Sequence, residues 1–228
     1  MIGKKAILWL AFTLAVAPDA LGGVLYDQPA SSGACACWTS SVAGGNGYQS
    51  FDNFQLSSPG NINAVTWQGL YADYLTLGNN PVGPDTVSWD IEFWSNNAGL
   101  PGTLLYDQNL LASQVTTTFL GTTNDLGAAT NVYAFSASLP SGFSAGAGTE
   151  YWFSVLSNQS TFDPIFSWTL GTGGDSITQQ EPLGSFGSGF IQQPGDRVFS
   201  LQTVPEPGTL GALLVGLGTL AFLKRRTA

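Results

Sequence analysis

Asp90 and Glu92 have the residue types and the spacing of a catalytic carboxylate pair. They lie two residues apart where polar and apolar side chains alternate, so a strand would place both on one face with Cα atoms about 6–7 Å apart. Glycoside hydrolases use two carboxyl groups about 5–9.5 Å apart. Strict alternation predicts that both acids are solvated, whereas a catalytic acid usually needs burial to raise its pKa. We therefore expect an ordinary solvent-facing strand, and a secreted glycoside hydrolase stays an alternative.

The absence of histidine from the 228 residues excludes the commonest catalytic devices, because triads, Cys-His pairs and histidine-ligated zinc sites need an imidazole. Between the terminal segments stand thirteen acidic residues and one basic residue, Arg197, a formal charge of about −12. Such a body cannot neutralise a phosphate backbone, so we exclude nucleic acid as a partner. No lysine is present there for Schiff-base or phosphate-loop chemistry. We expect a non-enzymatic protein without a cofactor.

Trp94 is the candidate for ligand contact. It follows Phe93, so on a strand it shares a face with Asp90 and Glu92, whereas Trp89 is expected in the core. An exposed indole beside two acids could stack on a sugar ring, which makes a surface carbohydrate-binding module the first alternative function. Cover by a neighbouring loop is the competing interpretation of Trp94.

Two loops offer oxygen ligands of the kind that calcium takes. Asn79 and Asn80 with Asp85 form one, and Asn124 with Asp125 forms the other. Neither has the spacing of an EF-hand, and turn chemistry alone accounts for most of these residues. A structural calcium ion therefore stays open, and we assign no metal ligands.

Cys35 and Cys37 are the only cysteines. A disulfide across one intervening residue closes a very short ring and tends to be strained and reducible. We expect two free or weakly bridged thiols.

The composition of the body, rich in β-branched and aromatic residues, predicts an all-β protein, because such residues suit a half-buried pleated surface. Residues 87–93 alternate cleanly, and the apolar run 150–156, with Trp152 as a core residue, is typical of a central strand covered on both faces. We expect an antiparallel two-sheet sandwich, jelly-roll-like. Further strands are predicted at 61–71, 113–121, 132–137, 161–170 and 197–203. Turns are predicted at 57–60, 78–81, 96–99, 139–142 and 171–174, and a type II turn centred on Pro101 and Gly102.

The N-terminal segment has the pattern of a secretory signal peptide. A cationic start, residues 1–5, precedes the apolar run 6–17, which is shorter than the about 20 residues of a membrane span. The best cleavage position follows Ala20-Leu21-Gly22, which makes residues 1–22 the signal peptide and 23–203 the β-sandwich domain. The alternative is a buried N-terminal helix.

The C-terminal segment, 204–228, combines a proline-rich motif, an uncharged apolar run and a basic end. Pro205 and Pro207 disfavour helix and sheet pairing around Glu206. The run 209–223 would form a transmembrane helix in lipid. The basic cluster that follows would stay on the cytoplasmic side and act as a topological stop: Lys224, Arg225 and Arg226.

This order of features resembles the PEP-CTERM sorting signal of Gram-negative bacteria: Pro205-Glu206-Pro207, a short transmembrane run, then Lys224-Arg225-Arg226. The resemblance covers about the last twenty-five residues. It implies that an exosortase in the membrane recognises and processes the tail, and that the mature protein reaches the cell surface or is released, often alongside exopolysaccharide production. A plain C-terminal membrane anchor is the competing interpretation.

A second resemblance concerns the body alone. Residues 93–106, with Asn96-Asn97-Ala98-Gly99-Leu100-Pro101-Gly102, and the later Gly148-Thr149-Glu150-Tyr151-Trp152 look like secreted bacterial β-sandwich domains. It implies a fold and no activity. The sequence thus predicts an exported surface or matrix protein that passes through the secretion machinery and the inner membrane, with an exosortase as partner and extracellular polysaccharide as a further candidate partner.

Overall fold

The computed structural model of the protein describes residues 23–32, 37–72, 84–125 and 128–204. Gly23–Val204 form one compact unit. The expected signal peptide, the Pro205-Glu206-Pro207 motif, the apolar run and the basic end lie outside the described residues. Within the described ranges, no helix has the length and the apolar character needed to cross a membrane.

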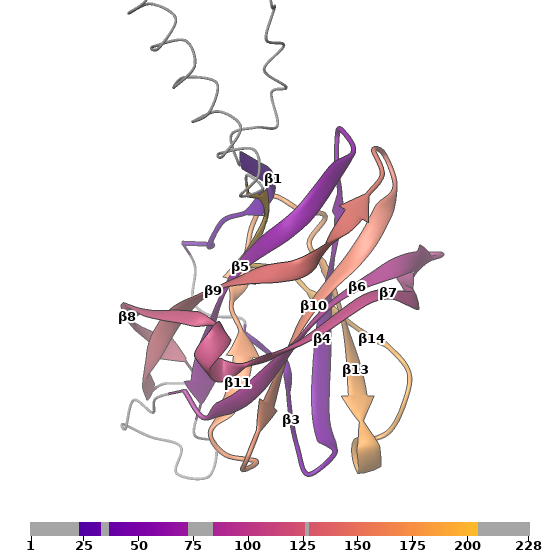
Figure 1. Ribbon diagram of the computed structural model, residues 1–228. Helices are drawn as coiled ribbons and strands as arrows, with labels where there is room; N and C mark the ends of the chain where they lie inside the picture. Colours follow the sequence, from indigo (N-terminus) through magenta and orange to yellow (C-terminus); the bar gives the residue numbers. More distant parts are fainter. Residues whose placement is uncertain (1–22, 33–36, 73–83, 126–127, 205–228) are drawn as a thin grey trace, which may run out of the picture. The chain divides into compact units, whose positions relative to one another are not determined.

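The body is all-β, as predicted, and two seven-stranded sheets account for most of it (Figure 1). In the first, which we call sheet 1, the long strand β5 (Gly60–Ala72) is central. It pairs with β9 along one edge and with β16 and then β11 along the other. The remaining strands of sheet 1 extend these three: β1 (Gly23–Gln28) beside β16 (Phe199–Thr203), β2 (Trp38–Thr39) beside β11 (Ile165–Trp168), and β8 (Thr116–Asp125) beside β9 (Ala128–Ala145).

The other large sheet, sheet 2, has β10 (Glu150–Gln159) at its centre. β10 pairs antiparallel with β4 and β6, and two of its residues also pair in parallel with β3. The full order is β14 (Ile191–Pro194), β13 (Ile177–Leu183), β4 (Asn46–Gln55), β3 (Ser41–Ala43), β10, β6 (Thr86–Asn97) and β7 (Leu100–Leu111). A two-stranded ladder and two short 3₁₀ turns complete the described elements: β12 (Leu170–Gly171) with β15 (Asp196–Arg197), η2 (Ala112–Gln114) and η3 (Gly184–Phe186).

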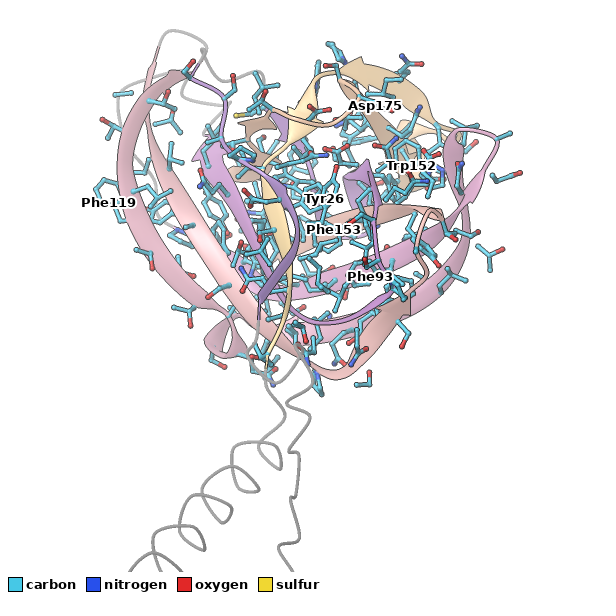
Figure 2. All side chains as sticks on the ribbon, turned by 90° about the horizontal axis from the view of Figure 1, so that it is seen from above. Tyr26, Phe93, Phe119, Trp152, Phe153 and Asp175 are labelled. Atoms are coloured by element: carbon cyan, nitrogen blue, oxygen red, sulfur yellow. The ribbon has the colours of Figure 1, made fainter. Side chains whose placement is uncertain are left out.

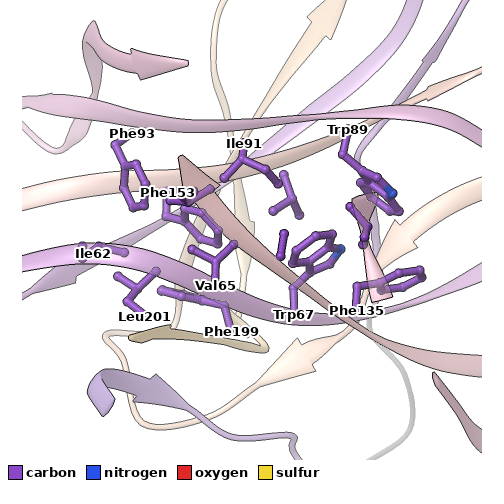
Figure 3. Packing of buried hydrophobic residues seen from close by; sticks show 14 of the residues in the cluster. Ile62, Val65, Trp67, Trp89, Ile91, Phe93, Phe135, Phe153, Phe199 and Leu201 are labelled. Carbon is purple, nitrogen blue, oxygen red and sulfur yellow. The ribbon is translucent and has the colours of Figure 1, made fainter. Parts of the chain in front are cut away.

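Aromatic side chains from both sheets form the core between them (Figure 3). Trp67 of sheet 1 meets Trp89 of sheet 2 with ring centroids 5.1 Å apart. Phe153 and Phe199 approach to 5.0 Å across the same interface. Large aromatic rings bury much apolar area each and favour such tilted and edge-on contacts. The two sheets therefore pack face to face, as in a sandwich.

Strands predicted from alternation or from dense apolar runs are confirmed at β5, β6, β9 and β10. The prediction of one strand over 161–170 is wrong in its extent, because the strands there are only Ile165–Trp168 and Leu170–Gly171. β8 starts at Thr116 and not at 113, because η2 precedes it.

Two predicted turns are wrong. Residues 139–142 lie inside β9, where Ser138 opposes Ala64 and Phe143 opposes Ile62, so the extra residues form a bulge and the strand continues. Pro101 and Gly102 belong to β7, and the chain reverses at Ala98 and Gly99. Both of these residues have positive φ, the backbone that a two-residue hairpin loop requires.

The one basic residue of the body, Arg197, is completely buried. Burial lowers the pKa of its guanidinium to about 10, while Asp52 and Asp196 act in the opposite direction. Its donors reach both sheets. Nη1 donates to the carbonyl of Trp168 in sheet 1 at 3.1 Å, and Nε donates to Oγ1 of Thr178 in sheet 2 at 3.1 Å. Nη2 donates to two carbonyl oxygens before β15, those of Pro194 (3.2 Å) and Gly195 (3.3 Å).

Two buried acidic side chains, Asp52 and Asp196, lie near Arg197. Asp52 accepts hydrogen bonds from the backbone N–H groups of Arg197 and Asn53, and Asp196 accepts from those of Gly174 (2.9 Å) and Ser176 (2.6 Å). Burial raises the pKa of Asp52 well above its ordinary value, against the lowering effect of the Arg197 hydrogen bond. We call Arg197, Asp52, Asp196 and Thr178 the arginine cluster.

Replacing Arg197 with Met should destabilise the fold by about 3–5 kcal/mol, because the buried carbonyl oxygens of Trp168, Pro194 and Gly195 lose their donor and two buried acids lose the nearby positive charge. Urea unfolding at pH 7, followed by tryptophan fluorescence, measures the loss. Asp27→Asn, on an exposed strand position, is the matched control and should change the unfolding free energy by less than about 0.5 kcal/mol. An equally small change for Arg197→Met would contradict the role assigned to the arginine cluster.

Gly69 of β5 is a second constraint, because an added Cβ would overlap the ring of Phe166 on the neighbouring strand. Gly69→Ala should therefore cost at least about 1–3 kcal/mol of stability, the usual penalty for overpacking. Thermal melting checks this. Gly146→Ala is the control, since its Cβ would meet nothing closer than 3.4 Å, and it should melt close to the wild type. Equal melting of the two variants would contradict the packing argument.

Candidate functional site

Glu92 and Trp94 lie together on the outer face of β6, as the alternation predicts. The indole N–H of Trp94 donates to Oε2 of Glu92 at 2.8 Å. The same oxygen accepts from Nε2 of Gln49 on β4 at 2.5 Å, and that amide also donates to Oγ of Ser154 on β10 at 3.0 Å. Three strands of sheet 2 thus contribute to one polar cluster, Gln49, Glu92, Trp94 and Ser154, which we call the Glu92 cluster.

The prediction that Glu92 is solvated is wrong, because its side chain is only 8% exposed. Gln49 and Trp94 cover it, and neither neighbour follows from the pattern along β6. Burial raises the pKa of Glu92 to about 6, opposed by hydrogen bonds from Trp94 and Gln49 and assisted by the charges of Asp107 and Asp90. The carboxyl group can therefore take up a proton near neutral pH.

Asp90 shares that face but has separate partners. Its two oxygens accept from the amides of Asn109 on β7 at 2.6 Å and Asn158 on β10 at 2.8 Å. Asp90 and Glu92 are side by side on one strand, whereas glycoside hydrolysis needs carboxyl groups that flank the scissile bond from two sides. The two carboxyl groups therefore lie side by side and do not face each other across a cleft.

Trp94 is half-buried and its ring meets Phe51 edge-on, with centroids 5.7 Å apart. Phe51 in turn packs edge-on against Phe190, which lies in the segment between η3 and β14, with ring centroids 5.6 Å apart. A loop thus covers part of this aromatic group. The sugar contact assigned to Trp94 stays a prediction.

Trp152 is buried as expected, at 1% exposure, but not in the core between the sheets. It alternates with Tyr151 and Phe153, which contact that core, so it faces outward. Its indole N–H donates to Asn96 at 3.2 Å. Asp175 lies on the same side of the molecule, far from Phe119 (Figure 2).

Carboxylates and amides form a second polar group near Trp152. Asn53 donates to Glu150 at 3.0 Å and to Asp175 at 2.8 Å, and Asn96 donates to the other oxygen of Glu150 at 3.1 Å. Both oxygens of Glu150 and one oxygen of Asp175 thus accept hydrogen bonds from side-chain amides. Among the residues with known placement, no three His, Cys, Asp or Glu side chains form a metal-ligand group.

The two predicted calcium loops are only partly described. Asn79 and Asn80 lie outside the described residues, and Asp85 accepts hydrogen bonds from the hydroxyl groups of Ser160 and Thr161. Asn124 and Asp125 belong to the end of β8. Calcium binding at either loop stays a prediction.

Of the two states expected for the cysteines, free or weakly bridged, the structure excludes the free one for Cys37, which is disulfide-bonded. The only other cysteine in the sequence, Cys35, lies outside the described residues. The other predicted site residues, Pro205, Glu206, Pro207, Lys224, Arg225 and Arg226, are also outside the described residues.

Sheet 1 carries a feature that the sequence analysis missed. A cavity of about 430 Å³ lies where β5, β9 and the start of β8 meet η2. Hydroxyl and amide side chains line much of it, among them Thr66, Ser136 and Ser138. Thr66, Ser136 and Ser138 are outward polar positions that the sequence shows, but no single strand shows that they share a hollow.

No family model matches the chain, and searches of the curated proteins and of the solved structures give no significant match.

The raised pKa of Glu92 predicts a pH dependence of stability. Its folded-state pKa, about 6, exceeds the ordinary 4.5, so the stability it contributes is fully present below pH 4.5 and is lost as pH rises through 6. The loss amounts to about 2 kcal/mol. Glu92→Gln should remove this component, so its unfolding free energy relative to wild type should improve by that amount between pH 4 and pH 7.

Urea unfolding of both proteins across this range measures the difference, which cancels the contributions of other acids. Asp90→Asn is the control variant on the same face. A wild-type minus Glu92→Gln difference that does not vary with pH would show that Glu92 titrates normally.

Proposed function

We propose that the protein is an exported, non-enzymatic cell-surface or extracellular-matrix protein whose C-terminal tail an exosortase processes. The observation that carries the proposal is the ordered tail Pro205-Glu206-Pro207, apolar run 209–223 and Lys224-Arg225-Arg226. Together with the signal-peptide pattern of residues 1–22, it directs the acidic body to the outside of the inner membrane. The first segment addresses the secretion machinery, and the tail holds the chain at the membrane until it is processed.

The way the body ends supports this proposal. Asn63 of β5 holds Val204 from both sides, because its Oδ1 accepts from the Val204 N–H at 2.6 Å and its Nδ2 donates to the Val204 carbonyl at 3.3 Å. β16, just before it, pairs with both β1 and β5. The last described strand ends at Thr203, so cleavage at the motif would remove none of the described strands of the sandwich.

The proposal includes a jelly-roll-like arrangement of the two sheets, an N-terminal signal helix and a C-terminal transmembrane helix. It also includes a role for charge. A body with about twelve excess negative charges stays soluble outside the cell and can be bridged by cations within an anionic matrix.

Carbohydrate binding is the second candidate function. Trp94 favours it, since the ring is half-exposed beside a carboxyl group and an amide. An aromatic ring with hydrogen-bonding groups at its edge suits a sugar, whose ring has apolar faces and polar edges.

Processing at the motif predicts the mass of the mature protein. The wild-type chain, expressed in a Gram-negative host that carries an exosortase, should lack the residues after the Pro205–Pro207 region. Intact-mass spectrometry of the cell-surface and culture fractions measures this. Glu206→Ala should stay unprocessed in the membrane fraction, whereas Glu150→Gln in the body should be processed normally. Recovery of wild type with Ala228 in place would instead support a permanent anchor.

A further inference from the structure

The cavity on sheet 1 lies beside a row of hydroxyl groups that crosses four strands. Ser200 of β16 opposes Thr66 of β5, Thr66 opposes Ser136 of β9, and Ser136 opposes Thr116 of β8. Opposed residues share a face, and here it is the outer face, because the flanking Val65, Trp67 and Phe135 belong to the core. Neighbouring strands are about 4.8 Å apart, so the row presents hydroxyl groups at a regular spacing.

A second row runs parallel to the first, two residues further along the strands. It consists of Gln202, Ala64 and Ser138. Ala64 is the small member between two longer polar side chains, and all three line the cavity. The missing side-chain volume at Ala64 is one reason why the surface is hollow there. The cavity volume, about 430 Å³, is within the about 300–1,000 Å³ of small-molecule sites.

The hydroxyl groups at this cavity are available to a ligand. Those of Thr66, Thr116, Ser136 and Ser138 have no hydrogen-bond partner among the described residues. None of the described residues that line the cavity has an acidic or basic side chain. Asp27 continues the first row on β1 but does not line the cavity. A ligand that fits must satisfy several neutral donors and acceptors at once.

These properties select one class of ligand. An anion finds no basic partner and is repelled by an acidic body, and a cation finds no carboxylate. A peptide strand would need a free sheet edge. β5 and β9, which form the floor of the cavity, are paired on both sides, and β8, whose other edge pairs with no described strand, contributes only Thr116 to the lining. A neutral carbohydrate carries hydroxyl groups that both donate and accept, and it needs neither a charge nor a sheet edge.

We propose that the cavity formed by Thr66, Ser136, Ser138, Gln202 and Ala64 on sheet 1 binds a short segment of a neutral polysaccharide. This site is on the opposite sheet from Trp94 and the Glu92 cluster. The inference goes beyond the proposed function, because it does not depend on processing of the tail. It gives an exported protein a way to hold an uncharged matrix polymer while its negative charge faces solvent elsewhere.

Saturation-transfer NMR on the full-length chain tests the site, in a detergent whose headgroup is not a sugar. The probes are trisaccharides of glucose, galactose, mannose and N-acetylglucosamine, with trigalacturonate as the charged comparison. At least one neutral trisaccharide should bind with a Kd of about 1 mM or tighter, and trigalacturonate should bind more weakly. Failure of all four neutral probes, or equal binding of trigalacturonate, would overturn the proposal.

Three variants locate the bound sugar. Thr66→Val keeps the side-chain shape and removes one hydroxyl group, so we expect about a three- to tenfold weaker Kd. Ser136→Ala with Ser138→Ala should weaken it further, and Ala64→Leu should abolish binding by filling the hollow. Thermal melting shows whether each variant is folded. A single folded variant with the expected loss of affinity is enough to place the sugar in this cavity.

Thr103→Val, at an exposed position of β7 on the other sheet, removes a hydroxyl group outside the cavity, so it is the matched control and should leave the affinity unchanged. Trp94→Ala tests the second candidate site separately. Loss of binding in Trp94→Ala, with wild-type affinity in Thr66→Val and Ser136→Ala/Ser138→Ala, would place the sugar on sheet 2 and reject this cavity. The readout uses purified protein, so its failure leaves the mass-spectrometric test of sorting unaffected.

Discussion

The fold depends on the burial of a single cation. Arg197 is the only basic residue between the terminal segments, and it lies inside the protein, bonded to Trp168 of sheet 1 and Thr178 of sheet 2. Removing a guanidinium from water is unfavourable unless acceptors surround it. Hydrogen bonds also tolerate less change of distance and angle than apolar contacts do. The arginine cluster therefore fixes how the two sheets meet at this end, while the aromatic core supplies most of the apolar burial.

Arg197 is the only basic residue that the structure describes, and it is buried. The acids among the described residues therefore have no basic side chain beside them on the surface, and the two outer faces of the sandwich differ. On sheet 2, Asp90, Glu92 and Glu150 are held by amides and an indole. On sheet 1, the rows through Thr66 and Ala64 present hydroxyl and amide groups around a cavity without charge. The outer face of sheet 2 thus carries carboxyl groups, among them Glu92 with a pKa of about 6, whereas the outer face of sheet 1 offers uncharged hydroxyl and amide groups at its cavity. Neither property conflicts with the extracellular role that we propose.

Local pattern predicted the strands whose inner positions are apolar, such as β6 and β10. It missed β4, because the inward positions of that strand include Ser50 and Asp52 as well as Phe54. Those polar residues are tolerated inside because Ser40, Thr39 and Arg197, all distant in the sequence or on other strands, bond to them. The same limit explains Glu92. Alternation assigned its face correctly, but it could not show that Gln49 and Trp94 would cover that face.

The sequence by itself determined the all-β class, the acidic and histidine-free chemistry, and the character of the two terminal segments, because composition and alternation are local properties of the chain. Only the tertiary structure decided which polar groups meet. The arginine cluster, the Glu92 cluster and the hydroxyl rows of sheet 1 each combine side chains from three or more segments far apart in sequence. Their meeting depends on strand register and on the pairing of the sheets, which long-range packing sets and which no two-residue period contains.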